Sequence, residues 1–155
     1  TPDMAIKMKT TVTTTVKAEC MSHSLAKVTT RDVSMLIDEP KERHGTNLGL
    51  SPTETALAAL AGCTNTIGQK CAAKLGIDIG NLDVTVKCQL NKLGVMLVEE
   101  IDNPFEKIEL TIIADGPASE EELAQVAEET AKYCALSKLY RSAGTVINED
   151  WRKAG

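Results

Sequence analysis

The stretch that most constrains this chain is residues 51–63, which has the properties of the start of a long apolar helix. Ser51 is a favourable N-cap, and Pro52 suits the first helical position because that position needs no N–H donor. Glu54 follows at the third helical position, so a capping box is complete. We predict a helix that begins at residue 52 and ends at Gly76 in a left-handed cap.

Apolar side chains recur every three or four residues along this helix, which is the spacing of one helical face. They are Ala56, Leu60, Cys63, Ile67, Cys71 and Leu75. A helix this apolar is expected to be buried rather than to lie on the surface. Cys63 therefore stands in the middle of a buried stripe, and it is the residue that a functional account must explain.

The length of 155 residues predicts a single domain over residues 1–155, large enough to have its own core. Hydrophobic residues make up 43% of the chain and aromatic residues only 3%. The core must therefore consist of Ala, Val, Ile, Leu and Met side chains. Because such a core is thin, an extensive interface with a second copy of the chain would help to complete it.

Several classes of function are disfavoured by composition. The net charge of −5 argues against nucleic acid, because phosphate binding needs a basic face. No apolar run reaches the roughly 18–20 residues that span a membrane, and no signal segment opens the chain. The five cysteines are odd in number and lack a C-x-x-C pair, and there are two histidines, so neither a disulfide framework nor a zinc site is expected. We expect a cytoplasmic protein with reduced thiols.

The first third of the chain has the patterns of three strands. Residues 4–19 partly alternate, residues 20–24 form a candidate turn, and residues 25–30 and 32–38 read as returning strands. These predict an antiparallel meander. The polar residues 41–49 then form a loop that leads to the helix, and such a loop is a common place for functional residues.

The second half predicts strands on either side of another helix. Residues 82–90 alternate, residues 95–99 are expected to pair with them as a hairpin, and residues 105–114 resume strand patterning. Ser119 and Glu122 form a second capping box for a helix that carries Cys134 and runs to about Arg141. A last strand is expected at residues 145–147. The whole order predicts an α+β fold.

Two blocks of the sequence resemble one known family, the OsmC/Ohr proteins. The first block consists of Asp38-Glu39-Pro40, Gly45, Gly49, Ser51-Pro52, Glu54, Ala58-Ala59-Leu60 and Gly62-Cys63. The second, residues 133–138, is similar to the family's C-P-V-S-K motif, with Ala135 where proline is usual. The likeness covers about residues 38–139. It implies an α+β, intertwined homodimer in which antiparallel sheets wrap around two long central helices from each chain.

The resemblance also implies a chemistry. In characterised members the two motif cysteines reduce organic hydroperoxides, which would make Cys63 the attacking thiolate and Cys134 the thiol that resolves it as a disulfide. A Glu and an Arg assist the first cysteine in the family, and Glu54 would be that Glu. An external dithiol, of lipoyl or another type, would reduce the disulfide, and no metal or organic cofactor is implied.

The cation beside Cys63 is the open question in this sequence. Arg43 is our main candidate, with Arg31 and His23 as alternatives, because the early strand region holds no arginine at the family's place. Glu54 lies nine residues before Cys63, about 13 Å along a helix axis and on the opposite side. It is therefore expected either to face the Cys63 of a partner chain or to hold an arginine that does, which predicts a site shared between two chains.

Three functions remain open from the sequence. The first is a peroxidase acting on small apolar peroxides, which an apolar lining around Cys63 would favour. The second is a non-enzymatic dimer that binds a small apolar ligand, and the third is a thiol redox sensor. A guanidinium within about 4–5 Å of the Cys63 sulfur would favour catalysis, because an opposite charge at that range stabilises the thiolate.

Overall fold

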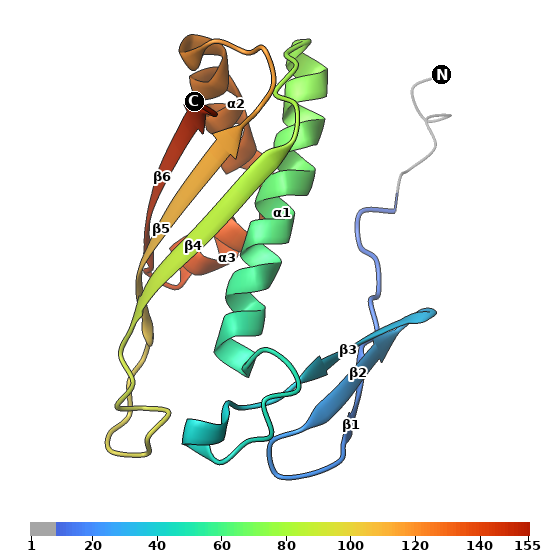
Figure 1. Cartoon of the computed structure of the whole chain (residues 1–155), viewed down its shortest axis with the longest axis vertical. Helices are drawn as coiled ribbons and strands as arrows, with labels where there is room; N and C mark the ends of the chain where they lie inside the picture. Colours follow the sequence, from blue (N-terminus) through green and yellow to red (C-terminus); the bar gives the residue numbers. More distant parts are fainter. Residues whose placement is uncertain (1–8) are drawn as a thin grey trace. The chain divides into compact units, whose positions relative to one another are not determined.

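The computed structural model describes residues 9–155 (Figure 1). The chain divides into two compact units, Thr1–Pro52 and Thr53–Gly155. The first unit consists of strands and loops, and the second contains a sheet and nearly all of the helical residues. The secondary structure is α+β, as predicted. That all 155 residues form one domain stays a prediction.

The first unit is built on a small antiparallel meander of three strands. Strand β1 covers Lys17–Cys20, β2 covers Ala26–Thr30 and β3 covers Val33–Ile37, and β2 lies between the other two. The predicted meander is confirmed. The first predicted strand is too long: its residues 4–8 lie outside the described residues, and residues 9–16 are not in a strand.

A buried carboxylate organises the loop that follows β3. Asp38 is fully buried, and its two oxygens accept hydrogen bonds from the backbone N–H groups of Glu39 and Leu48 at 2.7 and 3.1 Å. The hydroxyl of Thr46 also donates to it. This hydroxyl, together with the backbone donors, holds the pKa of Asp38 well below its usual range. A short 3-10 helix, η2 (Lys41–Arg43), lies within the same loop.

The long helix α1 spans Pro52–Leu75 and ends at Gly76, whose φ is +69°. Both predicted ends are therefore confirmed. Its buried residues are Leu60, Thr64, Gly68, Cys71 and Ala72. The expectation that this helix is buried is met on one face only, because Ala58, Ala59 and Gly62 are exposed in this chain. The buried face is also rotated from the predicted stripe, since Cys63 is half-buried and Leu75 is exposed.

The sheet of the second unit has three strands in the order β4-β5-β6. Strand β4 (Leu82–Leu90) is antiparallel to β5 (Phe105–Ala114), and β6 (Val146–Lys153) is parallel to β5. The prediction of purely antiparallel sheets is thus wrong at β6. The predicted strand at residues 95–99 is also wrong, because backbone bonds such as Val98 N–H to Leu93 O fold that segment into a loop.

Two helices connect β5 to β6. Helix α2 spans Glu120–Tyr133, and its capping box between Ser119 and Glu122 is confirmed. Helix α3 spans Ala135–Ser142. The prediction of one continuous helix to Arg141 is wrong, because Cys134 has an extended backbone (ψ 109°) that separates the two helices.

The core of the second unit lies between its sheet and its helices (Figure 1). One end of this core joins α1, β5 and α2 through Ala72, Ala114, Leu123 and Val126. The other end joins α1, β5 and α3 through Leu60, Ile108, Leu110 and Tyr140. It also includes Cys134, the residue directly before α3. The opposite face of the sheet is mostly polar. No helix in residues 9–155 has the length and apolar character that crossing a membrane requires.

Candidate active site

The two motif cysteines meet inside the second unit. The Cys134 thiol donates toward the Cys63 sulfur, and the two Sγ atoms lie 3.1 Å apart. Cys134 is 2% exposed, whereas Cys63 is half-buried. A disulfide has an S–S length of about 2.05 Å, so a shift of about 1 Å would join these sulfurs. The fold therefore brings together two residues that are 71 positions apart.

The break between α2 and α3 fixes the position of Cys134. Its N–H donates to the carbonyl of Thr130 at 2.9 Å and so closes α2. Its carbonyl accepts from the Lys138 N–H at 3.1 Å and from the Ser137 hydroxyl at 3.2 Å, and so opens α3. Cys134 is therefore held by its backbone on both sides.

The Cys63 sulfur is in a mainly apolar environment. Burial raises the pKa of the Cys63 thiol, while the backbone N–H groups of Leu136 and Ala135 act in the opposite direction. The adjacent Cys134 thiol acts in the same direction as burial, through the side-chain hydrogen bond between the two thiols and through charge repulsion. The net direction is upward. No lysine or arginine of the described residues is among the main influences on this pKa.

The other titratable groups in the same cluster are neutral ones. Burial raises the pKa of both the Cys88 thiol on β4 and the Tyr140 hydroxyl on α3. Both therefore remain protonated at neutral pH. The remaining partners of Cys63 in this cluster are apolar, among them Leu57, Leu60, Val84, Val86 and Leu136.

Glu54 lines a hollow of about 270 Å³ between α1 and β4. The other residues that line it are apolar: Leu57, Ala58, Ala61, Val84 and Val86. Two of these, Val84 and Val86, also pack in the cluster that contains Cys63. Glu54 thus lines an apolar hollow next to the hydrophobic cluster that contains Cys63. Cys63 itself is not among the residues that line this hollow.

The candidate cations lie in the first unit. Arg43 is in η2, and its guanidinium pairs with Glu39 at 2.7 Å. Arg31 stands in the tight turn between β2 and β3 with a φ of +52°. The ring of His23 lies 2.9 Å from the carbonyl oxygen of His44. That one of these three side chains stabilises the Cys63 thiolate stays a prediction.

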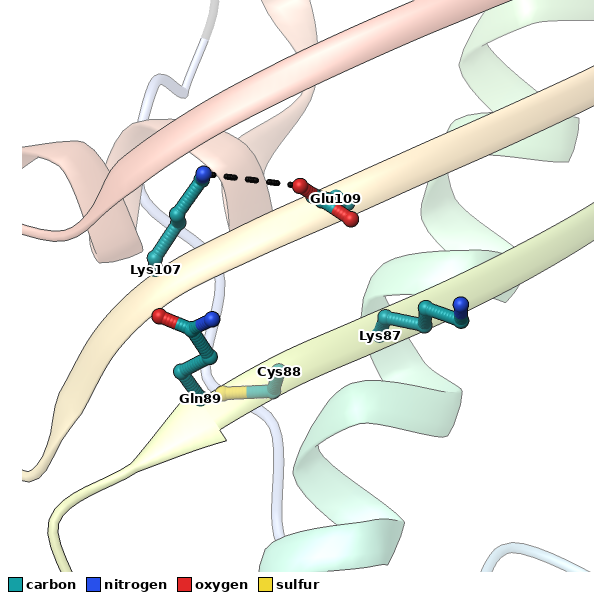
Figure 2. Close-up of a pocket in the computed structure, with 5 residues that line it drawn as sticks. All are labelled: Lys87, Cys88, Gln89, Lys107 and Glu109. Atoms are coloured by element: carbon teal, nitrogen blue, oxygen red, sulfur yellow. Dashed lines mark ion pairs between the residues drawn. The ribbon is translucent and has the colours of Figure 1, made fainter.

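A larger hollow, of about 370 Å³, lies on the polar face of the sheet (Figure 2). Lys87 and Gln89 of β4 and Lys107 and Glu109 of β5 line it, and Lys107 pairs with Glu109 at 3.4 Å. Its one thiol, Cys88, has a raised pKa and packs in the core. This hollow therefore lacks an activated group. Within residues 9–155, no cluster of His, Cys, Asp or Glu has the arrangement of a metal site.

Sequence reasoning missed the helix break that positions Cys134. Helix α2 stops at Tyr133 and a new helix starts at Ala135, so Cys134 lies at the junction between them. Residues 132–136 contain neither proline nor glycine, so no standard helix-breaking signal marks the interruption. Cys71, which was predicted to be a core residue, is 4% exposed and is confirmed as one.

The fold and the paired thiols are features of one class of protein. Comparison with known proteins identifies that class. The family model described as "OsmC-like protein" matches residues 45–149. The chain therefore belongs to the OsmC family, as the sequence resemblance predicted. A comparison with curated proteins found no match.

Solved structures of this fold are similar to the chain over nearly its whole length. An OsmC-like protein from Mycoplasma pneumoniae is 19% identical, with a TM-score of 0.79 over 93% of this chain and 99% of that one. An organic hydroperoxide resistance protein OsmC from Legionella pneumophila is 20% identical, with a TM-score of 0.66 over 95% and 100%. The organic hydroperoxide resistance protein OhrB of Bacillus subtilis is 18% identical, with a TM-score of 0.61 over 92% and 98%.

Proposed function

We propose that this protein is a thiol-dependent peroxidase that reduces organic hydroperoxides. The observation that carries the proposal is the 3.1 Å separation between the sulfurs of Cys63 and Cys134. Family membership supports it, and so do the names of the structural neighbours from Legionella pneumophila and Bacillus subtilis, which are organic hydroperoxide resistance proteins.

The proposed cycle uses the two thiols in turn. The Cys63 thiolate attacks the terminal oxygen of the hydroperoxide, the O–O bond breaks, and an alcohol leaves after taking up a proton. Cys63 is then a sulfenic acid. The Cys134 sulfur displaces hydroxide from it, so that a disulfide and one water form. An external dithiol, of lipoyl or another type, reduces the disulfide to two thiols and becomes a disulfide itself.

The apolar surroundings favour an organic substrate over hydrogen peroxide. The hollow beside Glu54 has a mostly aliphatic lining, which suits the hydrocarbon part of a small apolar peroxide. In this proposal Glu54 orients the hydroperoxide, and Arg43 is the candidate cation that favours the Cys63 thiolate. The cycle itself needs no metal and no organic cofactor.

We further propose that the working form is a homodimer whose site is shared between chains. Ala58, Ala59 and Gly62 leave one side of α1 exposed, and apart from Gly62, its two neighbours and the nearby backbone of α1, no atom of the described residues lies within 4 Å of the position that a Gly62 Cβ would take. Such small residues permit close helix packing against a second copy. Light scattering should report a dimer for the wild type and for Gln125→Arg, and a monomer for Ala58→Arg.

A thiol redox sensor is the second candidate function. The raised pKa of Cys63 favours it, because a thiol that is mostly protonated at neutral pH reacts slowly. A sensor would form the same disulfide without rapid turnover. Binding of a small apolar ligand without chemistry is the third, and the aliphatic hollow beside Glu54 favours it.

The test mixes reduced protein with one equivalent of cumene hydroperoxide and maps the products by mass spectrometry. We expect a Cys63–Cys134 disulfide within seconds in the wild type, and a Cys63 sulfenic acid in Cys134→Ser. Cys63→Ser should give neither product, and Cys88→Ser is the matched control that should behave as the wild type. Both thiols remaining reduced over minutes would remove the peroxidase proposal.

A further inference from the structure

Helices α1 and α2 enclose a hollow that the proposed thiol chemistry does not use. The two helices pack against each other through Ala72, Leu123 and Val126. The hollow between them has a volume of about 300 Å³, which is at the small end of the range of ligand cavities. It is lined by four residues of α1 and the last residue of α2, namely Ile67, Lys70, Cys71, Lys74 and Tyr133.

The lining of this hollow combines apolar surface with positive charge. Cys71 is buried, Ile67 is half-buried, and the Tyr133 ring forms a wall on the side of α2. The two ammonium groups of Lys70 and Lys74 are the only charges among the lining residues. A hollow of this composition favours a ligand that is both apolar and anionic, because each part of such a ligand then meets a matching surface.

A neighbouring carboxylate fixes Lys74 without cancelling the positive charge. Glu129 pairs with Lys132 at 2.7 Å and with Lys74 at 3.3 Å, so one carboxylate is shared between two ammonium groups. These two lysines, Lys132 first, hold the pKa of Glu129 below its ordinary value. The Lys74 ammonium also lies 5.2 Å from the centre of the Tyr133 ring, a cation–π contact that keeps it at the hollow.

Lys70 is the cation that is available to a ligand. Its side chain is exposed and has no ion-pair partner within residues 9–155. It stands one helical turn before Lys74, so the two Cβ atoms are about 5–6 Å apart and both ammonium groups can approach one anion. The chain as a whole has a net charge of −5, so this pair of lysines is a local reversal of its sign.

We propose that this hollow binds a small amphiphilic carboxylate. The carboxylate group lies beside Lys70 and Lys74, and the apolar part packs against Ile67 and Tyr133. A small inorganic anion would leave the apolar lining in contact with water, and a neutral apolar molecule would leave the Lys70 ammonium without a partner. Neither thiol of the proposed peroxidase cycle lines the hollow, so the inference is independent of the proposed function.

Phenylacetate is the probe, and 2-phenylethanol is its matched neutral control. Each is titrated into fully reduced protein, and the methyl NMR signals of Ile67 report binding at the hollow. We expect a saturable Ile67 shift with phenylacetate, roughly fivefold weaker binding of 2-phenylethanol, and weaker phenylacetate binding in added salt, because salt screens exposed charges. The methyl signals of Val84 and Val86, which line the separate hollow beside Glu54, should not move.

Lys70→Glu tests the role of the cation. The position is exposed, so the fold should be retained, and the new carboxylate repels the ligand. Phenylacetate should bind roughly fivefold more weakly. Lys87→Glu makes the same change in net charge at an exposed position on β4 outside this hollow, and it should bind phenylacetate as the wild type does.

Three results would overturn the proposal. They are equal phenylacetate affinities of Lys70→Glu and the wild type, the absence of a saturable Ile67 shift in the wild type, and a shift confined to Val84 and Val86. The last result would place the ligand in the hollow beside Glu54. No peroxide is used, so absence of peroxidase turnover would contradict the proposed function and not this inference.

Discussion

The two units of this chain are stabilised in different ways. The second unit has a continuous apolar core in which Leu60, Ile108, Ile112 and Val126 are 0% exposed. In the described part of the first unit, residues 9–52, no apolar residue is buried, and the buried residues there are polar, namely Asp38 and Ser51. One unit is thus held by apolar burial, whereas the other is held mainly by hydrogen bonds, among them those to the buried Asp38 carboxylate.

This difference indicates which unit fixes the position of the thiol pair. The thiol pair lies in the unit that has its own core, so the separation of its sulfurs is set by packing. Met35 and Leu36 on β3 of the first unit are 44% and 36% exposed. A small sheet with such side chains in water is marginal by itself. Its cover would come from a second copy in the proposed homodimer.

The largest expected effect concerns the core of the second unit. Leu60→Ala removes a fully buried side chain from the cluster that contains Cys134, so the free energy of unfolding should fall by about 2–5 kcal/mol. Urea denaturation measures this change. The control Leu139→Ala, at a position 63% exposed on α3, should change it by less than about 0.5 kcal/mol. Equal losses at both positions would contradict the assignment of the core.

The next effect should be confined to the first unit. Asp38→Asn replaces an oxygen acceptor with an NH₂ donor opposite backbone N–H groups, so the loop after β3 should open more often. Limited proteolysis should then cut residues 38–50 roughly tenfold faster, without faster cutting in residues 105–155. Asp32→Asn, at an exposed position, is the control and should cut like the wild type.

The same carboxylate predicts a pH dependence. Because the folded state lowers the pKa of Asp38, its stabilisation is complete above the unfolded value of about 3.9 and is lost as the pH falls below it. Opening of residues 38–50, followed by hydrogen exchange, should therefore be constant from pH 7 to 5 and should increase below about pH 4. Asp38→Asn should lack this acid dependence. A wild-type loop that opened first near pH 6 would point to a different group.

The smallest effect is expected at a surface ion pair of the second unit. Arg141 on α3 and Glu149 on β6 lie 3.1 Å apart, and the Arg141 side chain is 37% exposed. Arg141→Ala should lower the free energy of unfolding by no more than about 1 kcal/mol, and added salt should reduce the difference further. A loss as large as that of Leu60→Ala would show that this pair matters more than its exposure suggests.

Local signals in the sequence predicted much of the fold. Pro52 and Gly76 mark the ends of α1, and the alternation of residues 82–90 gives β4. The Ser119 and Glu122 capping box marks the start of α2. In each case the residues that carry the signal also make the local bonds or turns, so no tertiary information was needed.

The errors arose where tertiary structure overrides the local pattern. The run Val95-Met-Leu-Val98 is typical of a strand, yet Leu97 has a φ of +61° and is 92% exposed in a loop. The chain break at Cys134 carries no helix-breaking residue. The cysteines of the site could be named from the sequence, whereas their 3.1 Å separation depends on that break.

Steady-state consumption of cumene hydroperoxide with dihydrolipoamide as reductant tests the central claim most directly. The account predicts multiple turnovers by the wild type, none by Cys63→Ser, and a sharp loss of turnover with this dithiol in Cys134→Ser, which cannot form the internal disulfide. A fully reduced, folded wild-type protein that consumes no peroxide above the Cys63→Ser background would contradict it.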